Sequence, residues 1–66
     1  MTIVLNGEER GCREEMTLAD LVVELGLDKR RIAVEVNREI IPRDHYETHR
    51  LNAGDHIEIV HFVGGG

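Results

Sequence analysis

The chain has few of the residues that form cross-links, rigid bends or aromatic stacks. Its 66 residues include one cysteine, one proline, no tryptophan and two aromatic residues, Tyr46 and Phe62. A single cysteine excludes a disulfide framework within the chain and suits a reducing compartment. Two aromatic residues are too few for a platform on which nucleic-acid bases stack.

Long apolar runs and a basic excess are missing too. No run approaches the roughly 20 apolar residues that cross a bilayer, and residues 1–10 lack the features of a signal peptide. The net charge is -5, and basic residues cluster only at 29–31. Because nucleic-acid binding depends on neutralising phosphates, this charge argues against such a partner. We expect a cytoplasmic protein with no membrane or nucleic-acid partner, suited to a basic protein surface.

What the chain does have is the composition of one small globular domain. Apolar residues make up 41% of the sequence and charged residues 32%. A chain of this length buries only about 60% of the surface that its unfolded form exposes, so one thin core is the limit. We predict a folded domain over residues 1–63 and a flexible glycine tail over residues 64–66.

Hydrophobic periodicity predicts an α+β fold with a four- or five-stranded sheet and one main helix on one of its faces. Strand signals occur at residues 2–5, 9–14, 32–37, 40–41 and from 57 onward. Asn6-Gly7 favours a hairpin between the first two segments, and residues 43–50 are polar and loop-like. Thr17 and Asp20 resemble a helix capping box, and Gly26 suits the helix end.

The same periodicities predict which side chains are buried. The expected core consists of Ile3, Leu5, Leu18, Leu21, Val22, Leu25, Ile32, Val34, Val36, Leu51, Ile57 and Ile59. If Ile57 and Ile59 point inward, Val60 and Phe62 point outward, side by side near the tail. Such a pair is either loose surface packing or a docking site for a partner, and we favour docking.

The glycine tail is the segment most open to interpretation. Gly64, Gly65 and Gly66 have no side chain to bury and much freedom to lose, so we expect them to be disordered in the free protein. An incidental end or leftover linker would look the same. Extended from Val63, however, the tail reaches roughly 13 Å. It would carry an α-carboxylate, which is ionised at neutral pH because its pKa is about 3.5.

Other candidates for chemistry are weaker. His45 and His49 are four residues apart, but no third ligand is close in sequence, so we predict no metal site. The thiol of Cys12 has acidic as well as basic neighbours, and an inert thiol is the better interpretation. Nothing in the sequence supports an enzyme that acts alone, so we predict no catalytic residues.

Taken together, three segments resemble the sulfur carrier proteins of thiamine biosynthesis, the ThiS family. They are "TLADLVVELG" at 17–26, "NREIIPR" at 37–43 and "GDHIEIVHFVGGG" at 54–66. The resemblance covers essentially the whole chain. A third glycine, Gly64, precedes the family's diglycine and makes the tail more flexible. The resemblance implies the ubiquitin-like β-grasp fold, in which the first and last strands run parallel at the centre of a mixed sheet.

The resemblance also implies a function for the tail. The carboxylate of Gly66 would be adenylated by a partner enzyme, converted to a thiocarboxylate with sulfur that a cysteine desulfurase supplies, and used by thiazole synthase. Gly65 shares this role, and Val60, Phe62 and Val63 become docking neighbours. The carrier would bind no cofactor, because ATP and magnesium belong to the partner. Rival interpretations are the small subunit of molybdopterin synthase, a ubiquitin-like modifier and an interaction module with an idle tail.

Overall fold

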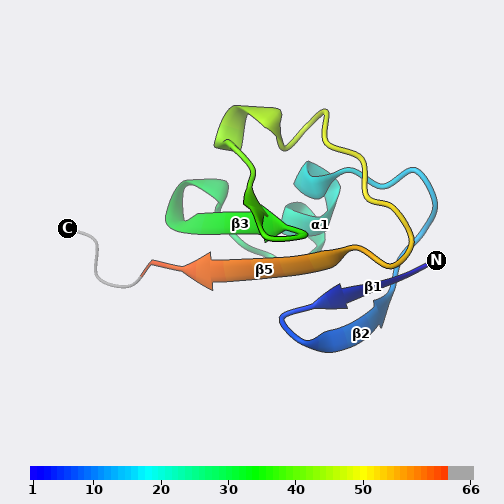
Figure 1. Ribbon diagram of the computed structural model, residues 1–66. Coiled ribbons are helices and arrows are strands. Elements are labelled where there is room, and N and C mark those ends of the chain that lie inside the picture. The colour runs from blue at the N-terminus through cyan, green and yellow to red at the C-terminus, as the bar shows by residue number, and fades with distance from the viewer. Residues whose placement is uncertain (63–66) are drawn as a thin grey trace.

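In the computed structural model, which describes residues 1–62, one helix lies across one face of a five-stranded sheet (Figure 1). The elements are β1 (Thr2–Leu5), β2 (Glu8–Gly11), α1 (Leu18–Glu24), η1 (Lys29–Arg31), β3 (Ile32–Val36), β4 (Glu39–Ile40), η2 (Arg43–His45) and β5 (His56–His61), where η marks a short 3-10 helix. The strand order is β2-β1-β5-β3-β4, and β1 and β5 are parallel while the other pairs are antiparallel. The predicted α+β architecture and the parallel central pair are confirmed.

Both hairpins of the sheet close through two-residue turns with left-handed backbone. Asn6 and Gly7 have φ of 49° and 83°, and Asn37 and Arg38 have φ of 51° and 72°. Positive φ at both central residues is the mark of a type I′ turn, whose twist matches that of the flanking strands. The turn at Asn6-Gly7 is confirmed.

The predicted bounds of the second and fourth strands were wrong, and those of β3 and β5 each differ from the structure by one residue at one end. The second strand covers residues 8–11 rather than 9–14, because the Asn6-Gly7 turn pairs Glu8 with Leu5 and the chain begins one residue before Thr2, the partner of Gly11. The short fourth strand covers residues 39–40 rather than 40–41, because the two-residue turn pairs Glu39 directly with Val36. In each case the partner strand and the turn set the register, which local sequence does not show.

The helix begins and ends as its sequence predicts. The backbone N–H of Asp20 donates to the Thr17 hydroxyl at 3.2 Å, and that of Thr17 donates to the Asp20 carboxylate at 3.0 Å, so the capping box is complete. At the other end, Gly26 has φ of 72°, and Leu27 N–H donates to the Val22 carbonyl at 3.1 Å. This 6→1 bond is the signature of a Schellman motif, for which glycine is the preferred residue.

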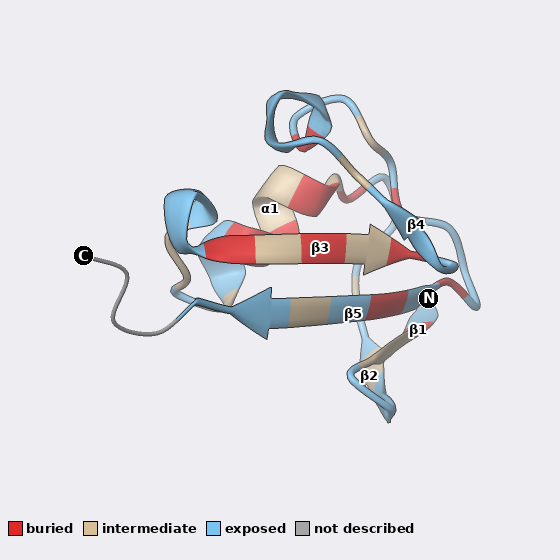
Figure 2. Ribbon diagram, turned by 60° about the vertical axis from the view of Figure 1, so that its left-hand side comes forward, coloured by how far each residue is buried: buried red, intermediate tan, exposed pale blue. Residues whose placement is uncertain are grey.

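The core lies between α1 and the sheet, as the burial colours show (Figure 2). All of the predicted core residues are buried except Leu5, Leu25 and Ile59, which are half-buried and pack against its edge. Met16 and Tyr46 are buried as well, which the sequence patterns did not predict. The helix stripe and the strand alternation therefore identify most of the core but not its rim.

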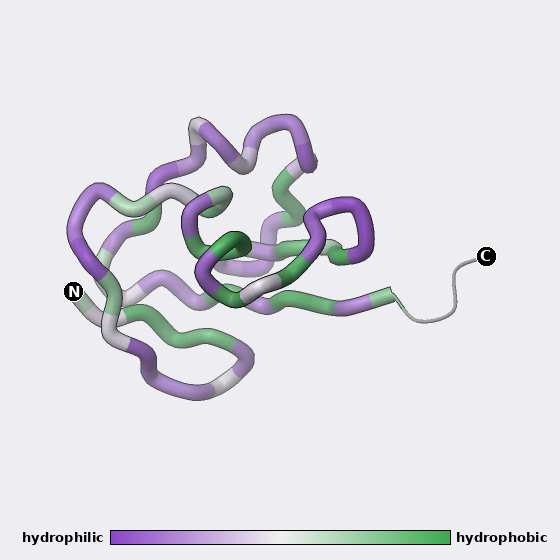
Figure 3. Tube along the Cα trace, turned by 180° about the vertical axis from the view of Figure 1, so that it is seen from behind, coloured by the Kyte–Doolittle hydropathy of each residue, from purple (hydrophilic) through white to green (hydrophobic). Residues whose placement is uncertain are grey.

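Tyr46 fixes a loop that looks wholly hydrophilic in sequence (Figure 3). Its side chain is 2% exposed, and burial raises the pKa of its phenol. Its carbonyl accepts a hydrogen bond from Ala19 N–H at 2.9 Å, and the His49 carbonyl accepts one from Leu18 N–H at 2.9 Å. The loop after β4 thus satisfies two backbone donors at the start of α1, where a helix has no partners of its own.

Candidate functional site

The residues predicted to meet a partner lie at the end of β5. Val60 and Phe62 are described by the structure, whereas Val63, Gly64, Gly65 and Gly66 lie outside the described residues. The geometry of the candidate site therefore rests on β5 and the elements beside it. Along β5 only Ile57, near the start, is buried and only Ile59 is half-buried, and the strand ends exposed (Figure 2).

The alternation along β5 is as the sequence predicts. Ile57 is 1% exposed and faces the helix, whereas Val60 is 59% and Phe62 50% exposed. Val60 and Phe62 are two residues apart and alternate with Ile57, so both lie on the face of the sheet that α1 leaves uncovered. Ala33 of β3 pairs directly with Val60 and lies on the same face. We call this surface the open face.

The open face continues onto β4 through a residue that the sequence analysis did not single out. Ile40 pairs with Glu35, which in turn pairs with Glu58 of β5, so the three residues form one row across the sheet. Ile40 is 73% exposed. The signal that could have found it is the register of the second hairpin, because a one-residue shift would turn Ile40 to the other face.

The row of Glu35 and Glu58 gives the open face two neighbouring carboxylates. Two carboxylates directly opposite each other across antiparallel strands repel, so the fold gains nothing from this pair. A cationic side chain on a partner would relieve the repulsion. The row thus suits a basic partner group next to the apolar Val60 and Phe62.

The end of β5 is held by hydrogen bonds on both sides. Phe62 N–H donates to the Arg31 carbonyl of η1 at 2.7 Å, and Ile59 N–H donates to the Asn6 side-chain oxygen at 2.8 Å. At the start of the strand, His56 N–H donates to the side-chain oxygen of Asn37 at 3.0 Å. Both turn asparagines therefore bind the last strand as well as shaping their own turns.

Asp55, just before β5, completes this anchoring and is the one buried polar residue recorded within 1–62. Its carboxylate accepts a hydrogen bond from Asn52 N–H at 2.8 Å and one from the Asn37 side-chain amide at 3.1 Å. Because a buried carboxylate without partners is costly, these bonds explain its position without a catalytic role. Asp55 is a structural residue of the site.

Next to the end of β5, the 3-10 turn η1 carries Lys29, Arg30 and Arg31. Arg30 forms an ion pair with Asp28 at 2.9 Å, and hydrogen bonds from the Arg30 side chain and backbone lower the pKa of Asp28 to about 2. Arg31 lies farther from Asp28, at 3.9 Å. The site therefore combines a local basic turn with an acidic row on the open face.

The comparison with family models decides the identity of the chain. The model of the ThiS family matches residues 3–66, nearly the whole sequence. The chain belongs to the ThiS family. Its sheet order, with β1 and β5 parallel at the centre, is that of the ubiquitin-like β-grasp fold.

Individual relatives and a solved structure agree with this assignment. The chain is 41% identical over 63 residues to the sulfur carrier protein ThiS of Bacillus subtilis, covering 94% of this chain and 96% of that protein. It is 50% identical over 66 residues to a thiazole synthase of Paramagnetospirillum magneticum, and spans only 20% of that protein's length. The crystal structure of a thiamine biosynthesis protein (ThiS) from Geobacter metallireducens superposes with a TM-score of 0.85 at 26% identity, covering both chains completely.

The remaining candidates, His45, His49 and Cys12, lie outside β5. His45 ends η2 and His49 follows one turn later, with His49 N–H bonded to the His45 carbonyl at 2.9 Å. Within residues 1–62 no three potential ligands gather to hold a metal ion. Cys12 is half-buried against the core, and its carbonyl accepts from the Met1 amine at 2.8 Å. No helix of the described chain is long and apolar enough to cross a membrane.

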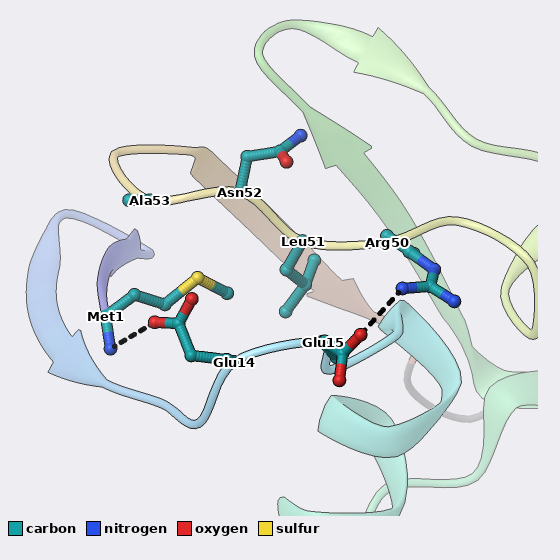
Figure 4. A pocket seen from close by; sticks show the side chains of 7 residues that line it. All are labelled: Met1, Glu14, Glu15, Arg50, Leu51, Asn52 and Ala53. Carbon is teal, nitrogen blue, oxygen red and sulfur yellow. Dashed lines mark hydrogen bonds and ion pairs between the residues drawn. The ribbon is translucent and has the colours of Figure 1, made fainter.

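Figure 4 shows a shallow hollow beside the N-terminus, which lies at the other end of the molecule from the end of β5 in Figure 1. Its lining residues are Met1, Glu14, Glu15, Arg50, Leu51, Asn52 and Ala53. The Met1 amine pairs with Glu14 at 3.4 Å, and Arg50 pairs with Glu15 at 3.5 Å. Since its charged groups are already paired and three of them are well exposed, the hollow offers no poised acid, base or nucleophile.

Proposed function

We propose that this chain is a sulfur carrier in thiamine biosynthesis and that the carboxylate of Gly66 is the group to which sulfur is attached. The observation that carries the proposal is the family match, which extends through Val63 and the three glycines to Gly66. The sulfur carrier of Bacillus subtilis, similar over almost its entire length, supports the same function. In this proposal the chain is a cosubstrate of its partner enzymes, and it works in the cytoplasm without catalysing a reaction itself.

The proposed chemistry begins with activation of a poor electrophile. A Gly66 carboxylate oxygen attacks the α-phosphorus of ATP and expels pyrophosphate, which leaves an acyl-adenylate. Sulfur that a cysteine desulfurase delivers as a persulfide then displaces AMP from the acyl carbon. Cleavage of the sulfur–sulfur bond by a second thiol leaves the thiocarboxylate on Gly66.

The proposed division of labour leaves the cofactors to the partners. An adenylating enzyme binds ATP and magnesium, and thiazole synthase accepts the sulfur, so the carrier itself holds no cofactor. The similarity to part of a thiazole synthase supports this acceptor, because a segment similar to this chain makes up about 20% of that thiazole synthase. Glycines at 64 and 65 suit the task, since a chain without Cβ atoms passes through a channel that larger residues would block.

Val60 and Phe62 provide the proposed docking contacts, with Val63 beside them. Their exposure of 59% and 50% on the last strand supports this role, because large apolar side chains are usually more deeply buried. The row of Glu35 and Glu58 next to them supports a partner surface with basic side chains.

The small subunit of molybdopterin synthase would use the same terminal chemistry with another acceptor, and a ubiquitin-like modifier would form isopeptide bonds to lysine. The match to the ThiS family model favours the thiamine pathway over both. Intact mass spectrometry of protein from its own cells separates the three. A thiocarboxylate form that accumulates in cells lacking thiazole synthase supports the proposal, whereas conjugates to other proteins support a modifier.

Deletion of Gly66 tests the loading site directly. We expect the truncated chain to keep its fold, because residues 1–62 contain the whole described sheet and helix. We also expect ATP–pyrophosphate exchange by the adenylating enzyme to fall to the level without carrier. Exchange at the wild-type rate with the truncated, folded chain would show that Gly66 is not the acceptor.

A further inference from the structure

Beyond Ile57, β5 has a neighbouring strand on one side only. The antiparallel ladder with β3 continues to the pair Ile32–His61, whereas the parallel ladder with β1 ends at Leu5–Ile57, where the chain turns. Figure 1 shows β5 extending past the end of β1. We call residues 59–61, on the side of β1, the β5 edge. Within residues 1–62 no strand lies beside it.

The backbone groups on the β5 edge follow from the alternation of a strand, in which successive residues bond to opposite sides. Phe62 N–H donates to Arg31, on the β3 side, at 2.7 Å. Ile59 N–H donates to the Asn6 side chain, on the β1 side, at 2.8 Å. His61 has the orientation of Ile59, so its N–H and C=O, with the carbonyl of Ile59, face the side without a strand.

The β5 edge also lacks the protection that edges usually carry. Natural sheets block their edges with charged residues or proline, which prevents pairing with other chains. The two outer strands of this sheet follow that rule, with Glu8, Glu9 and Arg10 on β2 and Glu39 on β4. Residues 59–61 are Ile, Val and His, with no proline, lysine or carboxylate. An unprotected edge inside an otherwise protected sheet points to a strand that binds there.

Surfaces suited to the side chains of such a strand lie on both sides of the edge. On the helix side is a shallow groove lined by Leu5, Asn6, Leu25, Leu27, Ile59 and His61. On the open face are the exposed Val60 and Phe62. Because side chains of an added strand alternate between the two faces, both sets would meet apolar surface.

Charge at the far end of the groove adds a further requirement. The chain runs from Leu27 directly into Asp28 and the basic turn η1. Asp28 is engaged by Arg30, and within residues 1–62 Lys29 takes part in no ion pair. A segment that follows the groove toward η1 is therefore best complemented by an acidic side chain at that end.

We propose that the β5 edge binds an extended segment of the adenylating partner, with apolar side chains for the groove and an acidic one for Lys29. The segment joins the sheet as a sixth strand, in the manner of β-strand addition. The identity of the partner rests on the proposed function. The edge itself rests on the strand register, the hydrogen-bond directions and the groove.

Two variants test the edge by separate means. His61→Pro removes an N–H that points to the side of β1, where no strand lies within residues 1–62, and it spares the ladder with β3. Proline is tolerated on a sheet edge. Leu27→Glu places a carboxylate in the groove. Val23→Glu is the matched control, because Val23 is 77% exposed on the helix and does not line the groove. Thermal unfolding establishes that each variant is folded before binding is measured.

Binding to the adenylating enzyme is measured by calorimetry, and the competence of the wild-type chain by ATP–pyrophosphate exchange. We expect both edge variants to raise Kd about tenfold or more, because His61→Pro removes a backbone hydrogen-bond donor and Leu27→Glu places a carboxylate against the apolar side chains of the bound segment. We expect Val23→Glu to leave Kd unchanged. If His61→Pro lowers the unfolding temperature strongly, the Kd of Leu27→Glu compared with that of Val23→Glu decides whether the β5 edge binds the partner.

The two hypotheses fail in different ways. A wild-type chain that is adenylated, with edge variants that are folded and bind as tightly, overturns the β5 edge and leaves the proposed function standing. Edge variants that weaken the binding of a wild-type chain that is never adenylated support the edge and refute the proposed chemistry.

Discussion

At the scale of single residues, the backbone positions with positive φ show how local chemistry fixes the fold. Gly26 adopts φ of 72° at the end of α1, and an added Cβ would meet no atom within 4 Å. Any cost of a side chain there therefore comes from the backbone conformation alone. This separates conformational strain from packing, which is seldom possible in so small a domain.

We predict that Gly26→Ala lowers the free energy of unfolding by about 1–2 kcal/mol, the cost of a left-handed conformation for an L-residue. Gly11→Ala is the control, because Gly11 has open space and no positive φ, and we expect its effect to stay within about 0.5 kcal/mol. Urea unfolding measures both. Equal effects of the two substitutions would contradict the role of Gly26 in the helix end.

A second prediction at this scale concerns acid. Hydrogen bonds from Arg30 to the charged form lower the pKa of the Asp28 carboxyl from its ordinary value of 3.8 to about 2 in the folded chain. A lowered folded pKa contributes stability that is complete above the unfolded pKa and is lost as the pH falls through the folded one. The unfolding temperature of Asp28→Asn should thus lie below that of the wild type at pH 6. The difference should shrink between about pH 4 and pH 2, and a constant difference would contradict the linkage.

At the scale of elements, α1 shows how much a helix can owe to packing. It has only seven residues, fewer than an isolated helix needs in water. Its capping box, its Schellman motif and the loop carbonyls at its start satisfy its ends, while Leu18, Leu21 and Val22 are buried against the sheet. The helix is therefore stable only as part of the whole core.

We predict that Leu21→Ala lowers the free energy of unfolding by about 2–5 kcal/mol, because Leu21 is fully buried. That loss is a large share of the stability of a small domain, typically about 5–15 kcal/mol. Val23→Ala, at a position of the same helix that is 77% exposed, should change the free energy of unfolding by no more than about 0.5 kcal/mol. Wild-type thermal stability of Leu21→Ala would rule out the packing of the helix on the sheet.

Elements also show where prediction from sequence succeeds and where it stops. The helix with both of its ends, and the inward and outward faces of β5, follow from periodicity and end signals alone. Tyr46 could not be predicted to be buried, since its neighbours are charged or polar and its burial depends on α1 lying against the loop. Leu5, Leu25 and Ile59 fit the core pattern but are only half-buried, because they lie where β1 ends. The sequence around each of these residues does not show where the neighbouring strand ends.

At the scale of the whole molecule, the parallel pairing of β1 with β5 is the fact that sequence patterns do not contain. Resemblance to the family supplied it, and the register confirms it. Of the candidate site, the outward Val60 and Phe62 could be predicted, whereas the contribution of Ile40 depends on hairpin register. The role of the glycines remains a proposal, because they lie outside the described residues.

We predict that Phe62→Ala weakens binding to the adenylating enzyme about tenfold, in the range of an apolar side chain at the centre of an interface. Because Phe62 is half-exposed, its replacement should leave thermal unfolding nearly unchanged. Val23→Ala is the control on the opposite side of the sheet. Titration calorimetry measures both, and wild-type affinity of Phe62→Ala would remove this residue from the docking surface.

The central position of β5 has a consequence for how the protein is made. The strand that lies between β1 and β3 is the last of the five to be synthesised, and the two paired residues Val4 and His56 are 52 positions apart. A nascent chain ending before residue 56 lacks the strand that joins the β1–β2 and β3–β4 segments, so α1 has no complete sheet on which to pack. Such long-range pairing makes folding slow relative to helical proteins of similar size. Translation of β5 is therefore the event that permits cooperative folding, and the chain becomes a folded domain only when the residues leading to the glycines have emerged from the ribosome.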